Sequence, residues 1–208
     1  MSKNLSHLPA QETLSQNDPV MKLLIDRYGD FDLTPHDRYY EELVSSIVSQ
    51  QLSVGAASTI WKRFIAHFDD VMPSPAQIIK TDTEDLRSVG LSYQKVSYIK
   101  DLAKHVLDGS LQIDTLANLP NSEVIKELVA VRGIGVWSAH MFMIFSLGRL
   151  DVLAWGDLGI RKSAKVLYDL PSLPDQKALE SLARDKGWTP YQSIACWYLW
   201  KNLDNKNQ

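Results

Sequence analysis

The sequence predicts an all-α protein. Apolar residues recur at helical spacing along most of the chain, glycines and prolines interrupt the pattern at short intervals, and runs typical of strands are scarce. With 208 residues, 45% of them hydrophobic and 23% charged, the chain can bury a sizeable core. We therefore expect one helical domain, or two small closely packed lobes, with short connections between helices.

Apolar spacing and helix breakers define six expected helices in the first half of the chain. The first three carry apolar side chains at helical spacing. A pair of prolines precedes the fourth, and a glycine follows each of the fifth and sixth. The expected ranges are residues 18–27, 37–48, 55–68, 76–80, 83–89 and 94–108.

Five more helices are expected in the second half. A Pro-Asn-Ser sequence starts the first of these, a glycine turn precedes the second, and an aspartate heads the third. Two prolines precede the last two helices. The expected ranges are residues 123–131, 136–147, 157–168, 175–186 and 190–201.

Composition excludes several classes of protein. No apolar run approaches the roughly 20 residues of a membrane helix, and residues 1–16 lack the apolar core of a signal peptide. We expect a cytoplasmic, nucleoid-associated protein, or a nuclear one in a eukaryote. The single Cys196 excludes an internal disulfide and a four-cysteine iron–sulfur cluster. The polar ends, residues 1–16 and 203–208, are expected to be disordered.

The most informative segment joins a glycine hairpin to an aspartate. The hairpin is Val131-Arg-Gly-Ile-Gly135, and Asp157 follows it by 22 residues, where another helix is expected to begin. Closely spaced glycines allow positive φ, so the amides at the next helix start can face outward and hold a phosphate. Either feature alone is more often structural, since Asp is a common N-cap. Together they indicate chemistry on nucleic acid.

The net charge of −3 argues against a nucleic-acid partner, because nonspecific DNA binders usually carry a basic surface. The distribution of charge weakens this objection. Residues 126–165 contain six basic side chains and three acidic ones, a local excess of three positive charges. Such an excess permits DNA binding, although a charged run is often only a solvated helix face.

The motif Leu128-x-x-Val131-x-Gly133-Ile134-Gly135-x-x-Ser138-Ala139, followed by Gly156-Asp157-Leu158-Gly159, resembles the helix-hairpin-helix DNA glycosylase superfamily. The resemblance implies a two-lobed helical bundle with a DNA-binding cleft between the lobes. It places the glycosylase domain at residues 17–208. The middle lobe would span about 53–154, and the second lobe would combine about 17–52 with 155–202.

Three segments are most similar to the alkylpurine (3-methyladenine) DNA glycosylases: Ile47-Val-Ser-Gln-Gln-Leu-Ser53, the hairpin with Asp157, and Trp188-Thr-Pro-Tyr-Gln-Ser193 leading to Trp200. The chain departs from that pattern at Ala154, Gly156 and Gln192. The resemblance implies excision of alkylated purines from duplex DNA by base flipping. Asp157 would stabilise the cationic sugar and orient the attacking water.

The resemblance also assigns the base pocket. Trp137 and Trp200 would form its walls, with Met141 and Tyr39 as further candidates, and cation–π attraction would favour a charged base. Family members that also cut the DNA backbone carry a lysine where this chain has Trp137. Indole cannot form a Schiff base, so we expect base excision without lyase activity. Trp137 and Trp200 could equally be core aromatics.

The remaining DNA contacts come from the same resemblance. Gly133, Gly135 and Ser138 would contact a phosphate at the hairpin. A loop comprising Gln50, Gln51, Leu52 and Ser53 would enter the minor groove, with Gln51 and Leu52 as the preferred wedge. The carbonyls that could hold a monovalent cation, Na⁺ or K⁺, belong to Val129, Val131 and Ile134. No other cofactor is required, and a monomer is expected.

Two alternatives from other classes remain open. One is a catalytically weak protein that binds abasic or distorted DNA with the same hairpin and wedge, and it would retain DNA without releasing a base. The other is a structural helix-hairpin-helix module in which Asp157 serves only as an N-cap. An absence of DNA binding at low salt would favour this second alternative.

Overall fold

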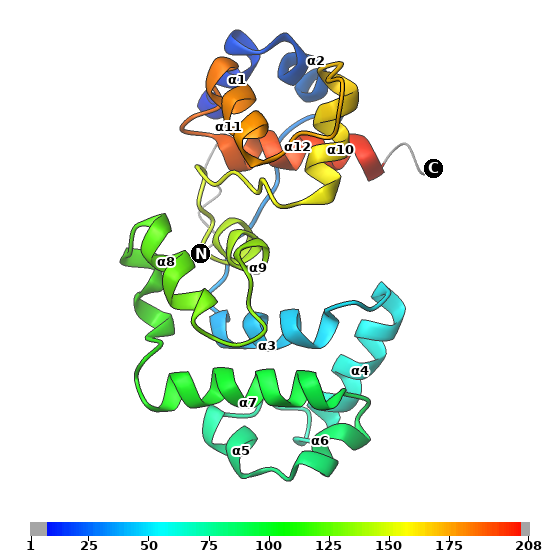
Figure 1. The fold of residues 1–208 in the computed structure, drawn as a ribbon, viewed down its shortest axis with the longest axis vertical. Helices are drawn as coiled ribbons and strands as arrows, with labels where there is room; N and C mark the ends of the chain where they lie inside the picture. The colour runs from blue at the N-terminus through cyan, green and yellow to red at the C-terminus, as the bar shows by residue number, and fades with distance from the viewer. Residues whose placement is uncertain (1–7, 205–208) are drawn as a thin grey trace. The chain divides into compact units, whose positions relative to one another are not determined.

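The computed structural model describes residues 8–204 and is helical, with no strand among these residues (Figure 1). The chain divides into two compact units. The terminal unit combines the residues up to Pro35 with those from Met143 onward, and the central unit is His36–Phe142. The expected all-α class is therefore confirmed. No helix in the described part of the chain is both long and apolar enough to cross a membrane.

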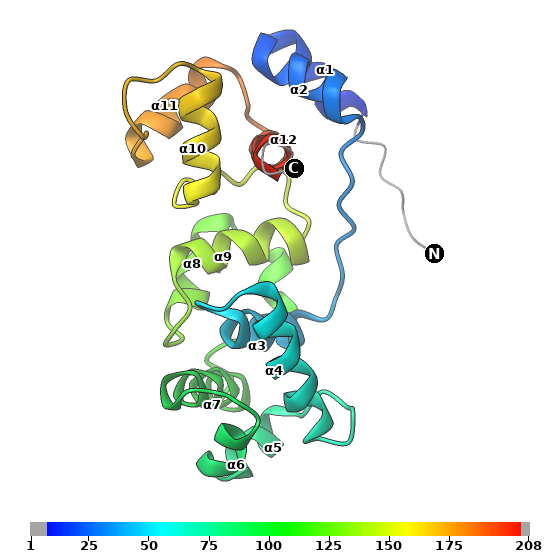
Figure 2. The same cartoon turned by 90° about the vertical axis from the view of Figure 1, so that its right-hand side faces the viewer.

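The terminal unit brings together both ends of the chain. In Figures 1 and 2 the last helix lies beside the second and the tenth. Its core contains Met21, Leu24, Trp188 and Tyr198, all fully buried. The helices are α1 (Leu8–Asn17), α2 (Pro19–Tyr28), α10 (Leu158–Leu167), α11 (Gln176–Asp185) and α12 (Gln192–Asp204).

A buried carboxylate, Asp18, links three segments of this unit. One of its oxygens caps α2 by accepting the Val20 N–H at 2.9 Å. The other accepts the Tyr168 hydroxyl at 2.6 Å and the Trp188 indole N–H at 2.8 Å. Burial, followed by the hydrogen bond to Asp18, raises the pKa of Tyr168 well above its ordinary value. Because every partner is a donor, the buried carboxylate is compensated.

The prediction that residues 1–16 are disordered is wrong for residues 8–16, which belong to α1. Leu14 is fully buried, and Gln11 donates from Nε2 to the Tyr198 hydroxyl at 2.7 Å, across 187 residues of sequence. Residues 1–7 lie outside the described part. At the other end, α12 continues through Leu203 to Asp204. The apolar residues of α1 are few, and their partners lie at the far end of the chain, so local pattern does not predict this helix.

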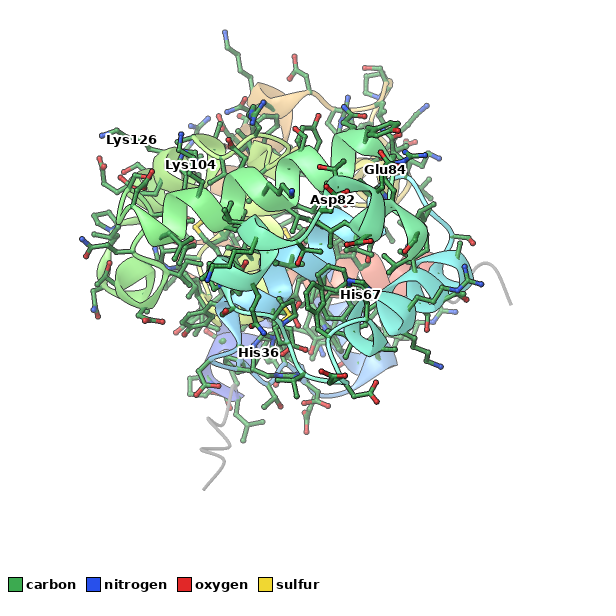
Figure 3. All side chains as sticks on the ribbon, turned by 90° about the horizontal axis from the view of Figure 1, so that it is seen from below. His36, His67, Asp82, Glu84, Lys104 and Lys126 are labelled. Atoms are coloured by element: carbon green, nitrogen blue, oxygen red, sulfur yellow. The ribbon has the colours of Figure 1, made fainter. Side chains whose placement is uncertain are left out.

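The central unit is organised around its longest helix. α7 packs against α3, α5 and α6 (Figures 1 and 2), and Asp82 and Glu84 at the start of α6 are exposed (Figure 3). Serine side chains cap α4, α5 and α7, as expected for residues that satisfy free N–H groups. The helices are α3 (Tyr39–Ser49), α4 (Val54–Ala66), α5 (Pro75–Lys80), α6 (Thr83–Ser88), α7 (Tyr93–Leu107), η1 (Ile113–Asn118), α8 (Asn121–Val129) and α9 (Val136–Met141).

Two local features differ from the sequence prediction. The 3₁₀ helix η1 was not expected, and the expected helix at 136–147 is divided into α9 and a π-helical turn, η2 (Phe142–Ser146). The boundaries of the two units also differ from those expected for the lobes. The buried face of α3 (Leu43, Val44, Ile47 and Val48) packs within the central unit, and this helix is therefore not part of the terminal one.

Candidate DNA-binding and catalytic sites

The hairpin between α8 and α9 is held by two buried apolar side chains. Val131 is fully buried and Ile134 nearly so, and the Ile134 N–H donates to the Val131 carbonyl at 3.2 Å. Gly133 lies between them at φ +87°, a conformation that favours glycine. Gly135 is the N-cap of α9 at φ −98°, which any residue can adopt. Positive φ is therefore confirmed at Gly133, but the expectation is wrong for Gly135.

The surroundings of the two glycines differ as well. A Cβ on Gly133 would lie 2.2 Å from Cδ2 of Tyr98, far inside van der Waals contact. A Cβ on Gly135 would meet nothing within 4 Å, and this residue is exposed. Gly133 is thus required by packing against α7. Gly135 lies where a bound group could approach the backbone closely.

Asp101 of α7 holds the hairpin through Arg132. Asp101 was not among the site residues predicted from the sequence. Its carboxylate accepts the Arg132 backbone N–H at 2.9 Å and the Arg132 Nε–H at 3.1 Å. Burial raises the pKa of Asp101, but the hydrogen bonds and charge of Arg132 together hold that pKa below its ordinary value. Arg132, which belongs to the basic excess of residues 126–165, therefore has a carboxylate partner within the protein.

The loop between α3 and α4 is bonded directly to the hairpin. Gln50 donates from Nε2 to the Gly133 carbonyl at 2.8 Å. Lys95 of α7 donates from Nζ to the Val48 carbonyl at 2.7 Å, and burial lowers the pKa of this lysine. The predicted wedge loop and the predicted phosphate-binding hairpin are therefore parts of one bonded structure within the central unit.

The tip of this loop is exposed. Gln51 has φ +57°, an uncommon conformation for a residue other than glycine, and Leu52 is 37% exposed. Ser53 caps α4 by accepting the Ala56 N–H at 3.4 Å. Of the four predicted loop residues, Gln50 and Ser53 thus have structural partners, whereas Gln51 and Leu52 project at the surface. Backbone strain of this kind is more frequent at functional sites than elsewhere.

The predicted aromatic pocket residues of the central unit fall in two places. Trp137 and Met141 are four residues apart on α9 and share a face, and the Trp137 side chain is 46% exposed. Ser138 follows Trp137 in the first turn of the same helix. Tyr39 instead packs edge-to-face on Phe142, with ring centroids 5.6 Å apart, and lines a cavity of about 580 Å³ between α3, α5 and η1. That cavity includes neither Trp137 nor Met141.

Asp157 is the N-cap of α10 in the terminal unit. Its Oδ1 accepts the Ile160 backbone N–H at 2.9 Å and the indole N–H of Trp200 at 2.9 Å. Both Asp157 and Trp200 are half-buried. The predicted catalytic acid and one predicted pocket aromatic are therefore in direct contact. This contact joins the start of α10 to α12.

The loop before Asp157 is tied to the start of α12. Gln192 donates from Nε2 to Asp151 Oδ1 at 2.7 Å, and the Ser193 hydroxyl accepts the Val152 N–H at 3.0 Å. The Asp157 N–H itself donates to the Ala154 carbonyl at 2.9 Å, which closes a turn. The chain departs from the glycosylase pattern at Ala154 and Gln192. Even so, the Ala154 carbonyl accepts a hydrogen bond from Asp157, and the Gln192 side chain is bonded to Asp151.

Backbone carbonyls of the hairpin are the candidate ligands for a monovalent cation. Val129, Val131 and Ile134 lie within one hairpin, and the Val131 carbonyl already accepts one hydrogen bond. A carbonyl oxygen has two lone pairs, so the chemistry of this donor set suits Na⁺ or K⁺. Across residues 8–204, no group of three or more His, Cys, Asp or Glu side chains is placed to hold a metal ion.

Comparison with known proteins identifies the family. Residues 44–188 match the model of the HhH-GPD superfamily of base excision DNA repair proteins, and the chain belongs to this superfamily. It is 33% identical to the alkylbase DNA glycosidase-like protein mag2 of Schizosaccharomyces pombe over the full length of both chains. It is 36% identical to DNA-3-methyladenine glycosylase 1 of the same yeast, covering 78% of this chain and 71% of that protein.

Solved structures agree with this assignment. A DNA-3-methyladenine glycosidase from Bacillus halodurans is 38% identical with a TM-score of 0.84, covering 97% of this chain and 90% of that one. The S. pombe 3-methyladenine DNA glycosylase Mag1, solved in complex with abasic DNA, is 32% identical with a TM-score of 0.80. That alignment covers 93% of this chain and 95% of the yeast protein. The superfamily expected from the hairpin and Asp157 is confirmed.

Proposed function

We propose that this protein is a DNA glycosylase that removes alkylated purines, such as 3-methyladenine and 7-methylguanine, from duplex DNA. The observation that carries the proposal is the carboxylate of Asp157, held by two N–H donors at the start of α10. Support comes from two relatives at least 33% identical, whose names denote action on alkylated bases. The proposed substrate would place the protein with the chromosome, in a nucleoid or a nucleus.

The chemistry follows from the lesion. Alkylation at N3 or N7 gives the purine a positive charge, so the base can leave without being protonated by the enzyme. As the glycosidic bond breaks, positive charge develops on the sugar, and an ionised Asp157 would stabilise that charge. The same carboxylate would orient or deprotonate the attacking water. The nucleotide must first leave the base stack, at a cost of about a few kcal/mol.

Recognition of the damaged base would rest on aromatic side chains. Trp137 presents an exposed ring on α9, with Met141 on the same face of that helix. Cation–π attraction to a charged purine is worth about 0.5–2 kcal/mol for a well-placed ring, and it responds to charge more than to base identity. Trp200 and Tyr39 are the further aromatic candidates of the proposed pocket.

DNA binding would use the bonded hairpin and loop of the central unit. The amides near Gly133, Gly135 and Ser138 would hold a phosphate at the start of α9. The exposed Gln51 and Leu52 would fill the space left by the flipped nucleotide. A monovalent cation on the hairpin carbonyls would help draw the phosphate toward these amides. We propose that the protein acts as a monomer and without lyase activity.

Release of free bases from methylated DNA, resolved by chromatography, tests the function. The parent protein should release alkylated purines. Asp157→Asn keeps an N-cap oxygen but removes the charge, so excision should fall by about a hundredfold or more while abasic-DNA binding persists. Equal excision by the two proteins would remove Asp157 from the catalytic role.

The same assay separates the alternatives. DNA binding by the parent protein without base release would indicate a damaged-DNA-binding protein. An absence of binding at low salt would indicate a structural module.

A further inference from the structure

Trp200 makes a contact with Asp157 that helix capping does not require. An N-cap carboxylate needs only the amides of its own helix, and the Ile160 N–H fills this role at 2.9 Å. The second donor to the same Oδ1 is the Trp200 indole N–H at 2.9 Å, from a helix 43 residues further along. Two donors on one oxygen fix the plane of the carboxylate, and with it the direction of Oδ2.

Gly159 leaves the space that this contact needs. A Cβ at this position would lie 3.0 Å from Asp157 Oδ1, 3.1 Å from Leu203 Cδ1 and 3.5 Å from Trp200 Cδ1. Glycine inside a helix destabilises it relative to alanine, and its backbone here has no positive φ that would require glycine. The absence of a side chain is therefore explained by the Asp157 carboxylate and the Leu203 side chain, beside which the indole also lies.

The indole is itself held in place by a neighbouring ring. Phe145 packs against Trp200 with ring centroids 5.5 Å apart and an interplanar angle of 31°. Burial, and to a smaller extent the charge of Asp157, raises the pKa of the nearby Cys196 to about 12, so its thiol stays neutral, and it donates to the Val152 carbonyl at 3.9 Å. Trp200 is thus a fixed, neutral donor directed at the carboxylate.

We propose that Trp200 is a positioning residue that orients the Asp157 carboxylate, and that Gly159 preserves the room for this pair. The inference rests on the proposed function, in which Asp157 stabilises the cationic sugar. It differs from the role of Trp200 as a wall of the base pocket, because it depends on the indole N–H rather than on the ring face.

Trp200→Phe tests the inference, because phenylalanine keeps an aromatic ring beside Phe145 but has no N–H. Trp197→Phe is the matched control on the same helix, where the ring packs on Phe31 at 5.4 Å. Single-turnover base release should slow by about 10- to 100-fold in Trp200→Phe, with substrate binding at the parental level, and stay unchanged in Trp197→Phe. A parental rate of base release in Trp200→Phe, or weakened substrate binding alone, would overturn the proposal.

Gly159→Ala provides a second variant, in which the new Cβ would lie 3.0 Å from Asp157 Oδ1 while alanine favours the helix. Its excision rate should fall although circular dichroism shows a folded protein, and parental excision would contradict the role given to Gly159. If the parent releases no base, the proposed function fails, whereas a parent that releases base no faster than Trp200→Phe overturns this inference alone.

Discussion

Replacing Gly133 with alanine should destabilise the protein, whereas the same change at Gly135, the N-cap of α9, should cost much less. At Gly133 the new Cβ would sit 2.2 Å from Tyr98 Cδ2, on a backbone at φ +87°. A residue with a Cβ pays about 1–2 kcal/mol in this conformation, and displacing a packed ring adds about 1–3 kcal/mol. We therefore expect the free energy of unfolding to fall by roughly 2–5 kcal/mol.

Thermal unfolding followed by circular dichroism measures this loss. For a chain of this length, about 2–4 °C of melting temperature corresponds to 1 kcal/mol, so Gly133→Ala should melt roughly 4–20 °C below the parent. Gly135→Ala is the control, because its backbone is not strained and its Cβ would meet nothing within 4 Å. Equal melting temperatures for the parent and Gly133→Ala would refute the packing argument.

A substitution at Gly135 tests the role of the hairpin in DNA binding separately from its role in stability. Gly135→Val places a β-branched side chain where the phosphate is proposed to approach, and its Cβ would meet nothing within 4 Å. Its affinity for all DNA sequences should fall, because phosphate contacts carry no sequence information. A folded Gly135→Val protein with parental affinity would argue against the hairpin as the DNA anchor.

Two further predictions concern pH and reaction type. Because the pKa of Asp101 is lowered by Arg132, its charge stabilises the fold at neutral pH, and this contribution disappears as the pH falls below about 4. Acid unfolding curves should therefore be steeper for the parent than for Asp101→Asn, and parallel curves would contradict this. With Trp137 at the lyase position, borohydride should trap no DNA adduct, whereas trapping would implicate another amine such as Lys162 or Lys165.

Much of the fold could be predicted because the signals are local. Apolar spacing, caps and breakers place α2 to α12 close to their observed ranges, as at α5 (Pro75–Lys80) against an expected 76–80. The helix α1 could not be found in this way, because its stability comes from burying Leu14 within a unit completed by the other end of the chain. The π-helical turn after α9 likewise has no local sequence pattern that predicts it.

The candidate site shows the same division between local and distant information. The hairpin motif and Asp157 were recognisable because glycine and N-cap residues carry their meaning at fixed spacing. The hydrogen bonds that hold these residues in place could not be recognised from the sequence. Gln50 reaches the Gly133 carbonyl across 83 residues, and Arg132 reaches Asp101 across 31. No periodic pattern relates such partners.

The sequence by itself determined the helical class, the superfamily and the position of the candidate acid, since each depends on residue types at short, regular separations. Only the tertiary structure decided what those residues touch. It assigned positive φ to Gly133 and left Gly135 in open space, and it brought Trp200 onto Asp157. The physical reason is that hydrogen bonds and steric contacts depend on distances in space, which packing sets between segments far apart in the chain.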